Sequence, residues 1–148
     1  MPKLTGGKRA DGALVDVQVG WSASRSRQLR AALKPVPPAI SARAILDSSA
    51  EITCIDVTIV RALGLTFGGT VLANLPAHGG LIGAGRYEAS TFVVHPSGST
   101  QDNLAIPDLS VLEISLASLG YEVILGRDVL ARCRFLYDGP ANQFELEY

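Results

Sequence analysis

The stretch that decides the fold runs Ala44-Ile45-Leu46-Asp47-Ser48-Ser49-Ala50-Glu51-Ile52-Thr53-Cys54-Ile55. Its first apolar run is typical of a buried strand, because a continuous apolar segment can be covered on both faces. Asp47 then lies where this strand ends and the chain turns. Carboxylates are rarely buried without a partner, so Asp47 is either a turn or capping residue or a functional acid. The local pattern alone favours the turn, since Asp and Ser are common turn residues.

The composition suits one domain with a hydrophobic core. The chain has 148 residues, of which 47% are hydrophobic and 18% charged, and its formal net charge is -1. This is the length of a single domain. No basic stripe is visible, so we expect no nucleic-acid partner. We interpret the early cations as a solvated surface segment, because Asp11 and Asp16 interrupt them and no aromatics interleave: Lys3, Lys8, Arg9, Arg25, Arg27, Arg30 and Lys34.

The residues that usually bind metals are sparse and scattered. Cys54 and Cys133 lie in apolar contexts, where free thiols behave as small hydrophobes, and a zinc site needs more Cys and His at tighter spacing. His78 and His95 belong to no metal motif, so we predict neither a metal nor a cofactor. No signal-peptide core and no apolar run near the roughly 20 residues of a membrane span is visible. We therefore expect a cytoplasmic protein without a membrane partner.

Local patterns predict many short strands and two short helices. The strands are expected at residues 13–19, 40–46, 52–55, 65–73, 86–94, 104–106, 109–116, 121–125, 134–137 and 143–148. The helices are expected at 57–63, between Asp56 as N-cap and Gly64 as stop, and at 127–133. This pattern predicts a mainly β fold, closed or nearly closed.

The remaining segments complete the predicted domain organisation. Residues 1–12 are expected to be a flexible N-terminal segment, followed by one domain over 13–148. Within it, residues 20–38 contain three prolines and are expected to form a long inserted loop, with a weak helical pattern at 28–33. The glycine-rich region of about 75–88 is expected to be a mobile hairpin.

A second landmark, residues 123–130, reads Val-Ile-Leu-Gly-Arg-Asp-Val-Leu. Together with residues 44–55 and the glycine-rich hairpin between them, it resembles the retropepsin-like aspartic proteases, in their single-domain form, over residues 13–148. The resemblance implies a closed acid-protease barrel that forms a homodimer. Each subunit would supply one Asp, and two carboxylates in contact share a proton, so that one serves as base and the other as acid.

The resemblance assigns roles to named residues. Asp47 matches the catalytic acid. Ser48, Ser49 and Ala50 match the supporting loop, in which the Ser48 hydroxyl would bond across the dimer. Glu51 and Arg127 are expected to form a structural ion pair. The flap that closes over substrate matches residues 77–86, with His78, Gly79, Gly80, Leu81, Ile82 and Gly83 as its substrate-binding residues. Ile52, Leu81, Ile82 and Val123 are candidate pocket walls, although plain core packing is the better interpretation for Val123.

The chain departs from the family at one position. The motif is Asp-Thr-Gly or Asp-Ser-Gly, but its third residue here is Ser49. Three interpretations stay open: the serine is tolerated with altered substrate fit, it abolishes catalysis, or it is an introduced replacement. The predicted function is an aspartic endopeptidase that acts on an extended, mostly apolar peptide. The alternative is a catalytically impaired dimerisation or peptide-binding module, and a weaker one is a metal-dependent hydrolase using Asp47, Asp128 and a His.

Overall fold

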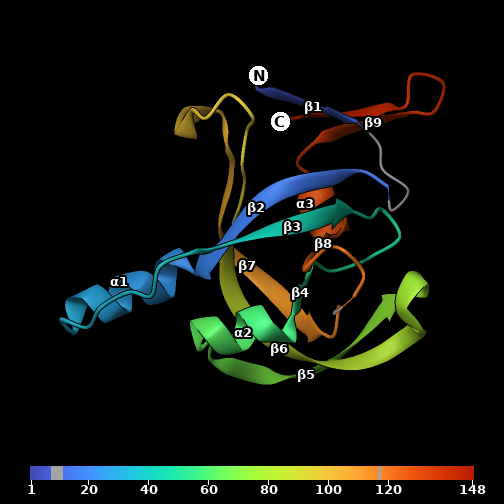
Figure 1. Ribbon diagram of the computed structural model, residues 1–148. Coiled ribbons are helices and arrows are strands. Elements are labelled where there is room, and N and C mark those ends of the chain that lie inside the picture. Colours follow the sequence, from blue (N-terminus) through green and yellow to red (C-terminus); the bar gives the residue numbers. More distant parts are fainter. Residues whose placement is uncertain (8–11, 117) are drawn as a thin grey trace.

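The computed structural model describes residues 1–7, 12–116 and 118–148, and within them the chain is mainly β (Figure 1). The strands are β1 Lys3–Gly7, β2 Leu14–Trp21, β3 Ile40–Leu46, β4 Cys54–Asp56, β5 Phe67–Leu75, β6 Gly80–Val93, β7 Leu104–Ile114, β8 Val123–Leu125, β9 Arg134–Asp138 and β10 Gln143–Glu147. The helices are α1 Ala23–Ala31, α2 Val57–Leu63 and α3 Arg127–Leu130, with short 3-10 turns η1 Pro76–His78 and η2 Thr100–Asp102. The predicted mainly β class is confirmed.

Six of these strands close a barrel. The hydrogen-bonded order of the large sheet is β2-β3-β8-β4-β7-β6-β5, and β2 also pairs with β6. This second pairing, from Val17↔Val93 to Trp21↔Ala89, joins the two ends of a ring of six strands. The remaining strand, β5, pairs with β6 to form a long hairpin outside the ring. The closed barrel that the strand pattern predicts is therefore confirmed.

The barrel interior is filled by the inward faces of its strands. In β2 the residues Val15, Val17 and Val19 are buried and alternate with exposed polar ones, as a half-buried strand requires. In β8 all three residues are buried, because the strand lies between β3 and β4. A second, smaller apolar cluster lies between the turn after β3 and the β5–β6 hairpin: Ala50, Cys54, Ala73, Leu75, Ala84, Leu112, Leu116 and Ile124.

Both chain ends belong to a second sheet, in the order β1-β10-β9. Leu4 of β1 is buried with Phe144 of β10 in the main core. The prediction of a flexible segment over residues 1–12 is therefore wrong for Lys3–Gly7, and residues 8–11 lie outside the described residues. Local sequence could not reveal β1, since its partner β10 lies at the other end of the chain.

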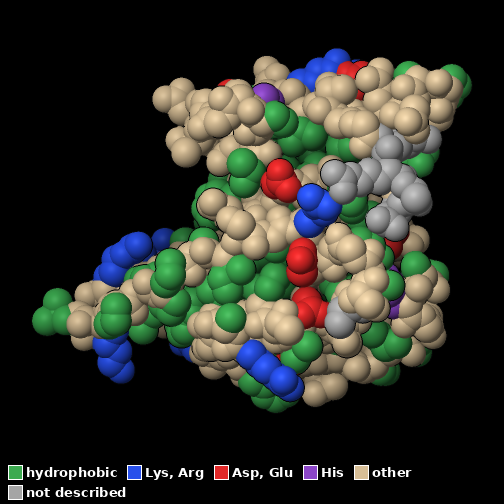
Figure 2. All heavy atoms as spheres, in the orientation of Figure 1, with side chains coloured by type: hydrophobic (Ala, Val, Ile, Leu, Met, Phe, Trp, Pro, Cys, Tyr) green, Lys and Arg blue, Asp and Glu red, His purple; other side chains and the backbone are tan. Residues whose placement is uncertain are grey.

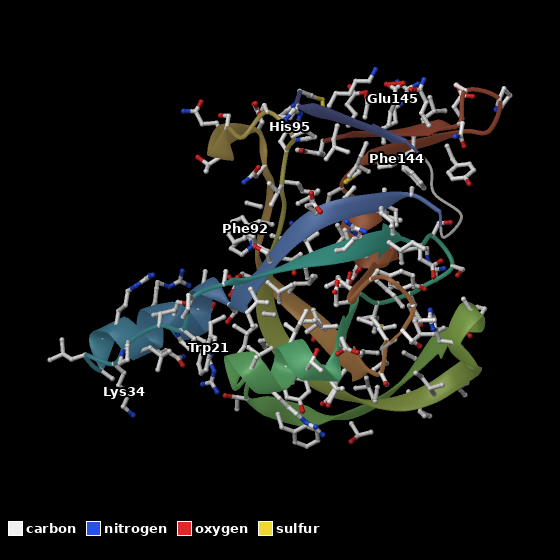
Figure 3. All side chains as sticks on the ribbon, viewed as in Figure 1. Trp21, Lys34, Phe92, His95, Phe144 and Glu145 are labelled. Atoms are coloured by element: carbon white, nitrogen blue, oxygen red, sulfur yellow. The ribbon has the colours of Figure 1, made fainter. Side chains whose placement is uncertain are left out.

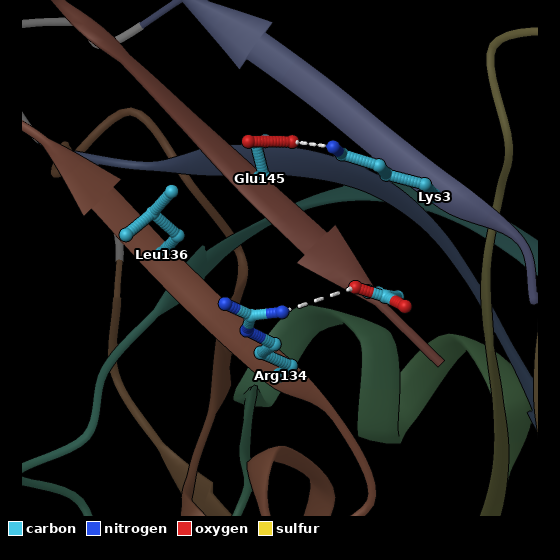
Figure 4. A pocket seen from close by; sticks show the side chains of 5 residues that line it. Lys3, Arg134, Leu136 and Glu145 are labelled. Carbon is cyan, nitrogen blue, oxygen red and sulfur yellow. Dashed lines mark ion pairs between the residues drawn. The ribbon is translucent and has the colours of Figure 1, made fainter.

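The outer face of this terminal sheet pairs its own charges (Figure 4). Lys3 forms an ion pair with Glu145, and Arg134 lies 4.0 Å from Glu147. Exposed pairs of this kind contribute about 0–1 kcal/mol each. This face is therefore a solvated surface whose charges are largely balanced.

The helices confirm one prediction fully and correct the other. α2 begins after its N-cap Asp56, which accepts a hydrogen bond from the Thr58 N–H at 3.0 Å, and it ends at Gly64 with φ 63°. α3 ends at Leu130, earlier than the predicted residue 133. The prediction of only two helices is wrong, because α1 occupies much of the expected 20–38 loop and protrudes from the barrel (Figure 1). Among the described residues, no helix is both long and apolar enough to cross a bilayer.

One strand is longer than its sequence indicates. Pro107 predicts a break between two short strands, but β7 runs continuously from Leu104 to Ile114. Its pairing with β6 shifts between Ala89 and Thr91, so that the strand bulges at the proline. A bulge accommodates a residue without an N–H group. β5 has a similar register shift in its pairing with β6, between Phe67 and Thr70, where Gly68 and Gly69 lie.

Candidate active site

Asp47 is positioned by the end of a barrel strand. Leu46 is the last residue of β3 and pairs with Leu125 of the parallel strand β8. The Asp47 N–H extends that pairing with a hydrogen bond of 3.0 Å to the Leu125 carbonyl. The chain then turns, and the Ala50 N–H donates to the Asp47 carbonyl at 3.2 Å. The predicted strand that ends in an acid is therefore confirmed, with Asp47 half-buried, but the strand is not covered on both faces, because Ala44 and Leu46 are buried while Ile45 is half-buried.

The carboxylate of Asp47 is held by the residue where the family motif has glycine. Its Oδ1 accepts hydrogen bonds from the Ser49 N–H at 2.9 Å and from the Ser49 hydroxyl at 2.6 Å. Ser48 and Ser49 are exposed, whereas Ala50 is buried in the second apolar cluster. The serine side chain therefore fits the loop without a clash and orients the acid.

A second turn, at the start of α3, packs against the Asp47 loop and is hydrogen-bonded to it. The Arg127 N–H donates to the Ala50 carbonyl at 2.8 Å. A Cβ on Gly126 would lie 2.9 Å from both the Ala50 carbonyl oxygen and the Ile52 carbonyl carbon, closer than real Cβ atoms approach backbone. Only glycine lets the two loops pack this closely without a shift.

Thr53 and Asp128 join the same two turns through side chains. The Asp128 carboxylate accepts from the Thr53 N–H at 3.0 Å and from the Thr53 hydroxyl at 2.7 Å. The Thr53 oxygen in turn accepts from the Gly126 N–H at 3.1 Å. Sequence reasoning did not single out Thr53 for the site. The available signal was a hydroxyl residue between two apolar residues of a predicted strand.

The predicted ion pair between Glu51 and Arg127 is wrong. Among the described residues, the ion pairs do not include these two side chains. The Arg127 guanidinium instead donates to the Ser48 carbonyl at 3.1 Å and approaches the Ser49 carbonyl at 3.5 Å. Both Glu51 and Arg127 are exposed, and loop carbonyls satisfy the guanidinium where it lies. Arg127 therefore supports the loop, but through its backbone oxygens.

Asp47 lines an open hollow of about 510 Å³ together with the tip of the β5–β6 hairpin. The tip contributes Ala77 and His78, and in Figure 1 it lies on the same side of the barrel as the turn after β3. The other described residues that line the hollow are Gly12, Ala13, Ile45, Leu46, Ser48, Tyr121, Phe135 and Tyr137. A single carboxylate, that of Asp47, therefore faces a mainly apolar and aromatic surface.

The predicted flap residues divide into two groups. His78 lines the hollow, whereas Gly79, Gly80, Leu81, Ile82 and Gly83 are not among its described lining residues. Leu81 points outward and is 68% exposed, while Ile82 packs on the second apolar cluster. Gly79 and Gly80 have φ of 103° and 82°, a conformation that favours glycine in a tight turn.

The candidate pocket walls are also partly revised. Val123 is fully buried, as core packing predicts, and Ile52 packs beneath the loop in the second cluster. Aromatic residues that sequence reasoning missed, Tyr121, Phe135 and Tyr137, line the hollow instead. They come from the segment before β8 and from β9, which local patterns could not place beside Asp47.

Neither a reactive thiol nor a metal centre accompanies Asp47 among the described residues. Burial, with added repulsion from Asp128 and Asp47, raises the pKa of Cys54 to about 12, so the thiol stays protonated and unreactive. Among the described residues, no three His, Cys, Asp or Glu side chains are grouped to hold a metal ion. Asp128 turns its carboxylate to Thr53, so the metal-hydrolase alternative loses a proposed ligand.

Comparison with known proteins adds no relative to this geometry. No protein-family model matches the chain, and no curated protein matches it. The arrangement of Asp47, the hairpin tip and the aromatic hollow therefore has to be interpreted from its own chemistry.

Proposed function

We propose that the protein is a homodimeric aspartic endopeptidase. The observation that carries this proposal is the Asp47 carboxylate, fixed at the end of a barrel strand and lining a hollow that a hairpin tip also lines. Peptide hydrolysis without a metal or covalent intermediate needs one group to accept a proton from water and another to donate one. The described lining offers a single carboxylate, so a second copy would supply its partner.

The loop geometry suits such a pair. The hydrogen bonds that Asp47 accepts from the described residues both end on Oδ1, which leaves Oδ2 for water or for a second carboxylate. One Asp of the pair would take a proton from water while the other protonates the peptide carbonyl. The substrate would lie extended between the hairpin and the barrel, held by main-chain hydrogen bonds as an added strand.

Peptide cleavage by matched variants tests the proposal. The purified protein is incubated with an apolar peptide library between about pH 4 and 7, beside Asp47→Asn and the control Asp16→Asn. Asp16 is an exposed acid of β2 outside the hollow. We expect cleavage by the parent and by Asp16→Asn, none by Asp47→Asn, and a dimer in light scattering. Cleavage that survives Asp47→Asn, or a strictly monomeric active protein, contradicts the proposal.

A second candidate is a peptide-binding dimer without catalysis. The bond of 2.6 Å from the Ser49 hydroxyl to Asp47 favours it, because this donor occupies one of the two carboxylate oxygens that a catalytic pair would use. Ser49→Gly and Ser49→Ala separate the two functions. If the hydroxyl blocks catalysis, both variants gain cleavage that Asp47→Asn abolishes. If the parent and both variants bind peptide but leave it intact, the binding module is the better conclusion.

A further inference from the structure

The segment between Asp16 and Asp47 is basic, although the chain as a whole is nearly neutral. Residues 17–46 contain Arg25, Arg27, Arg30, Lys34 and Arg43 and no acid, which leaves eight cations against fourteen acids in the rest of the sequence. The acids that interrupt the early cations all precede residue 17. This segment therefore carries a local positive charge that overall composition conceals.

α1 and the segment that leads from it to β3, residues 23–39, form an arm that carries four of these cations away from the barrel. Figure 2 shows Lys and Arg side chains on both sides of this arm, and Figure 3 places Lys34 near its outer end. Leu33 at the same end is 94% exposed and has a φ of 56°, an uncommon conformation for a leucine. The arm therefore presents charge and an apolar side chain to solvent together.

A groove of about 270 Å³ lies where the arm meets the barrel. Its apolar described lining is Trp21, Ala23, Val36, Pro37, Ala39, Phe92 and Pro107. Arg30, Ser26 and Ser90 add polar groups to the same groove. Trp21 lies at the base of the arm, where its Nε1 donates to the Leu63 carbonyl at 2.7 Å (Figure 3). The walls are therefore mainly apolar, with aliphatic, proline and aromatic side chains and a cation beside them.

The first turn of α1 already holds a carboxylate of the same chain. Asp108 of β7 accepts a hydrogen bond of 3.0 Å from the Ser24 N–H. Hydrogen bonds from Ser24 and the nearby Arg27 keep the pKa of Asp108 below its usual value. Among the described residues, neither Arg30 nor Lys34 takes part in an ion pair. These two cations remain available to carboxylates from outside.

We propose that the arm docks an acidic polypeptide segment of a partner protein, with an apolar side chain in the groove and carboxylates on Arg30 and Lys34. Charge complementarity selects the acidic partner. The two aromatic residues of the lining, Trp21 and Phe92, are half-buried, and a hydrogen bond to the Leu63 carbonyl fixes the Trp21 ring on the barrel. The groove therefore suits an apolar side chain of a polypeptide better than a nucleic acid, whose bases need exposed aromatic faces for stacking. The arm lies across the barrel from the β5–β6 tip (Figure 1), so this proposal does not rest on the proposed peptidase activity.

Binding of a defined probe tests this docking site. The probe is a fluorescein-labelled peptide of Glu, Leu and Pro residues, measured by anisotropy with the full chain at low salt. Val36→Asp introduces a charge into the groove, and Arg30→Glu reverses the cation. The control Arg132→Glu reverses an exposed cation in the turn after α3. We expect Arg30→Glu and Val36→Asp each to weaken binding at least about tenfold and Arg132→Glu to leave it unchanged.

Three outcomes overturn the docking site. The first is equal loss of binding in Arg30→Glu and Arg132→Glu, which indicates only a diffuse charge effect. The second is tighter, Arg30-dependent binding of a labelled single-stranded oligonucleotide, which identifies the arm as a nucleic-acid site. The third is self-association in sedimentation that Arg30→Glu abolishes while the probe does not bind. Tight probe binding that a Glu-to-Gln version of the peptide loses supports the proposal.

Discussion

Replacing Thr53 by valine removes the hydroxyl that links the segment after the Asp47 turn to the turn at the start of α3. The side chain is fully buried, and valine has nearly the same shape. The change deletes the hydrogen bond of 2.7 Å to Asp128 and the acceptor for the Gly126 N–H at 3.1 Å. Leaving a buried donor unsatisfied costs about 1–3 kcal/mol, and losing a hydrogen bond to a charged group costs a similar amount. Because the two costs overlap, we expect a loss of about 2–4 kcal/mol in the free energy of unfolding.

Urea unfolding at a fixed protein concentration measures this loss. The fixed concentration matters, since the apparent stability of a protein that self-associates depends on its concentration. Thr70→Val is the matched control, because Thr70 is exposed on β5, and such surface changes stay within about 0.5 kcal/mol. If Thr53→Val and Thr70→Val unfold at the same urea concentration, the Thr53–Asp128 bonds do not hold the two turns together.

Two further predictions concern neighbouring groups. Gly126→Ala should destabilise the fold by about 1–3 kcal/mol through backbone crowding. Gly139→Ala, whose Cβ meets nothing within 4 Å, should be nearly neutral in the same urea assay. Equal urea midpoints for the two variants contradict the close approach of Gly126 to the Ala50 and Ile52 carbonyls. Burial would raise the pKa of Asp56, but hydrogen bonds from the Thr58 hydroxyl and the Leu116 N–H outweigh it and keep the pKa below its usual 3.8. The stabilisation by ionised Asp56 is therefore present above pH 3.8 and lost as pH falls through the lowered pKa. The difference in free energy of unfolding between the parent and Asp56→Asn should therefore shrink in acid. A difference that stays constant with pH refutes this prediction.

Local signals in the sequence predicted the elements whose causes are local. α2 has a capping Asp56 before it and Gly64 after it, and β3 has a continuous apolar run that ends at Asp47. Both could be placed because capping and burial patterns act over a few residues. The predicted roles of the flap and of the dimer remain predictions, since they concern ligands and partners.

The missed features have non-local or weak causes. α1 buries little besides Ser26 and so has no apolar stripe. The sequence therefore offered only the weak helical pattern at 28–33 and Ser22, whose hydroxyl caps the helix by accepting from the Arg25 N–H. β1 depends on a partner at the other end of the chain. The prediction of a Glu51–Arg127 ion pair was wrong because a loop carbonyl accepts the hydrogen bond of the Arg127 guanidinium. No pattern of residue types reveals such a backbone acceptor.

The glycine requirement of this site lies in a different place from the one that the motif indicates. Backbone crowding demands glycine at 126, where a Cβ would meet the Ala50 carbonyl at 2.9 Å. At Ser49 the side chain is exposed and hydrogen-bonded to the acid that it follows. Substitutions at 126 therefore act on folding, whereas substitutions at 49 act on the carboxylate. It follows that Ser49→Gly should leave the urea midpoint close to that of the parent while changing whatever chemistry Asp47 performs, so cleavage by this variant reports on mechanism rather than on stability.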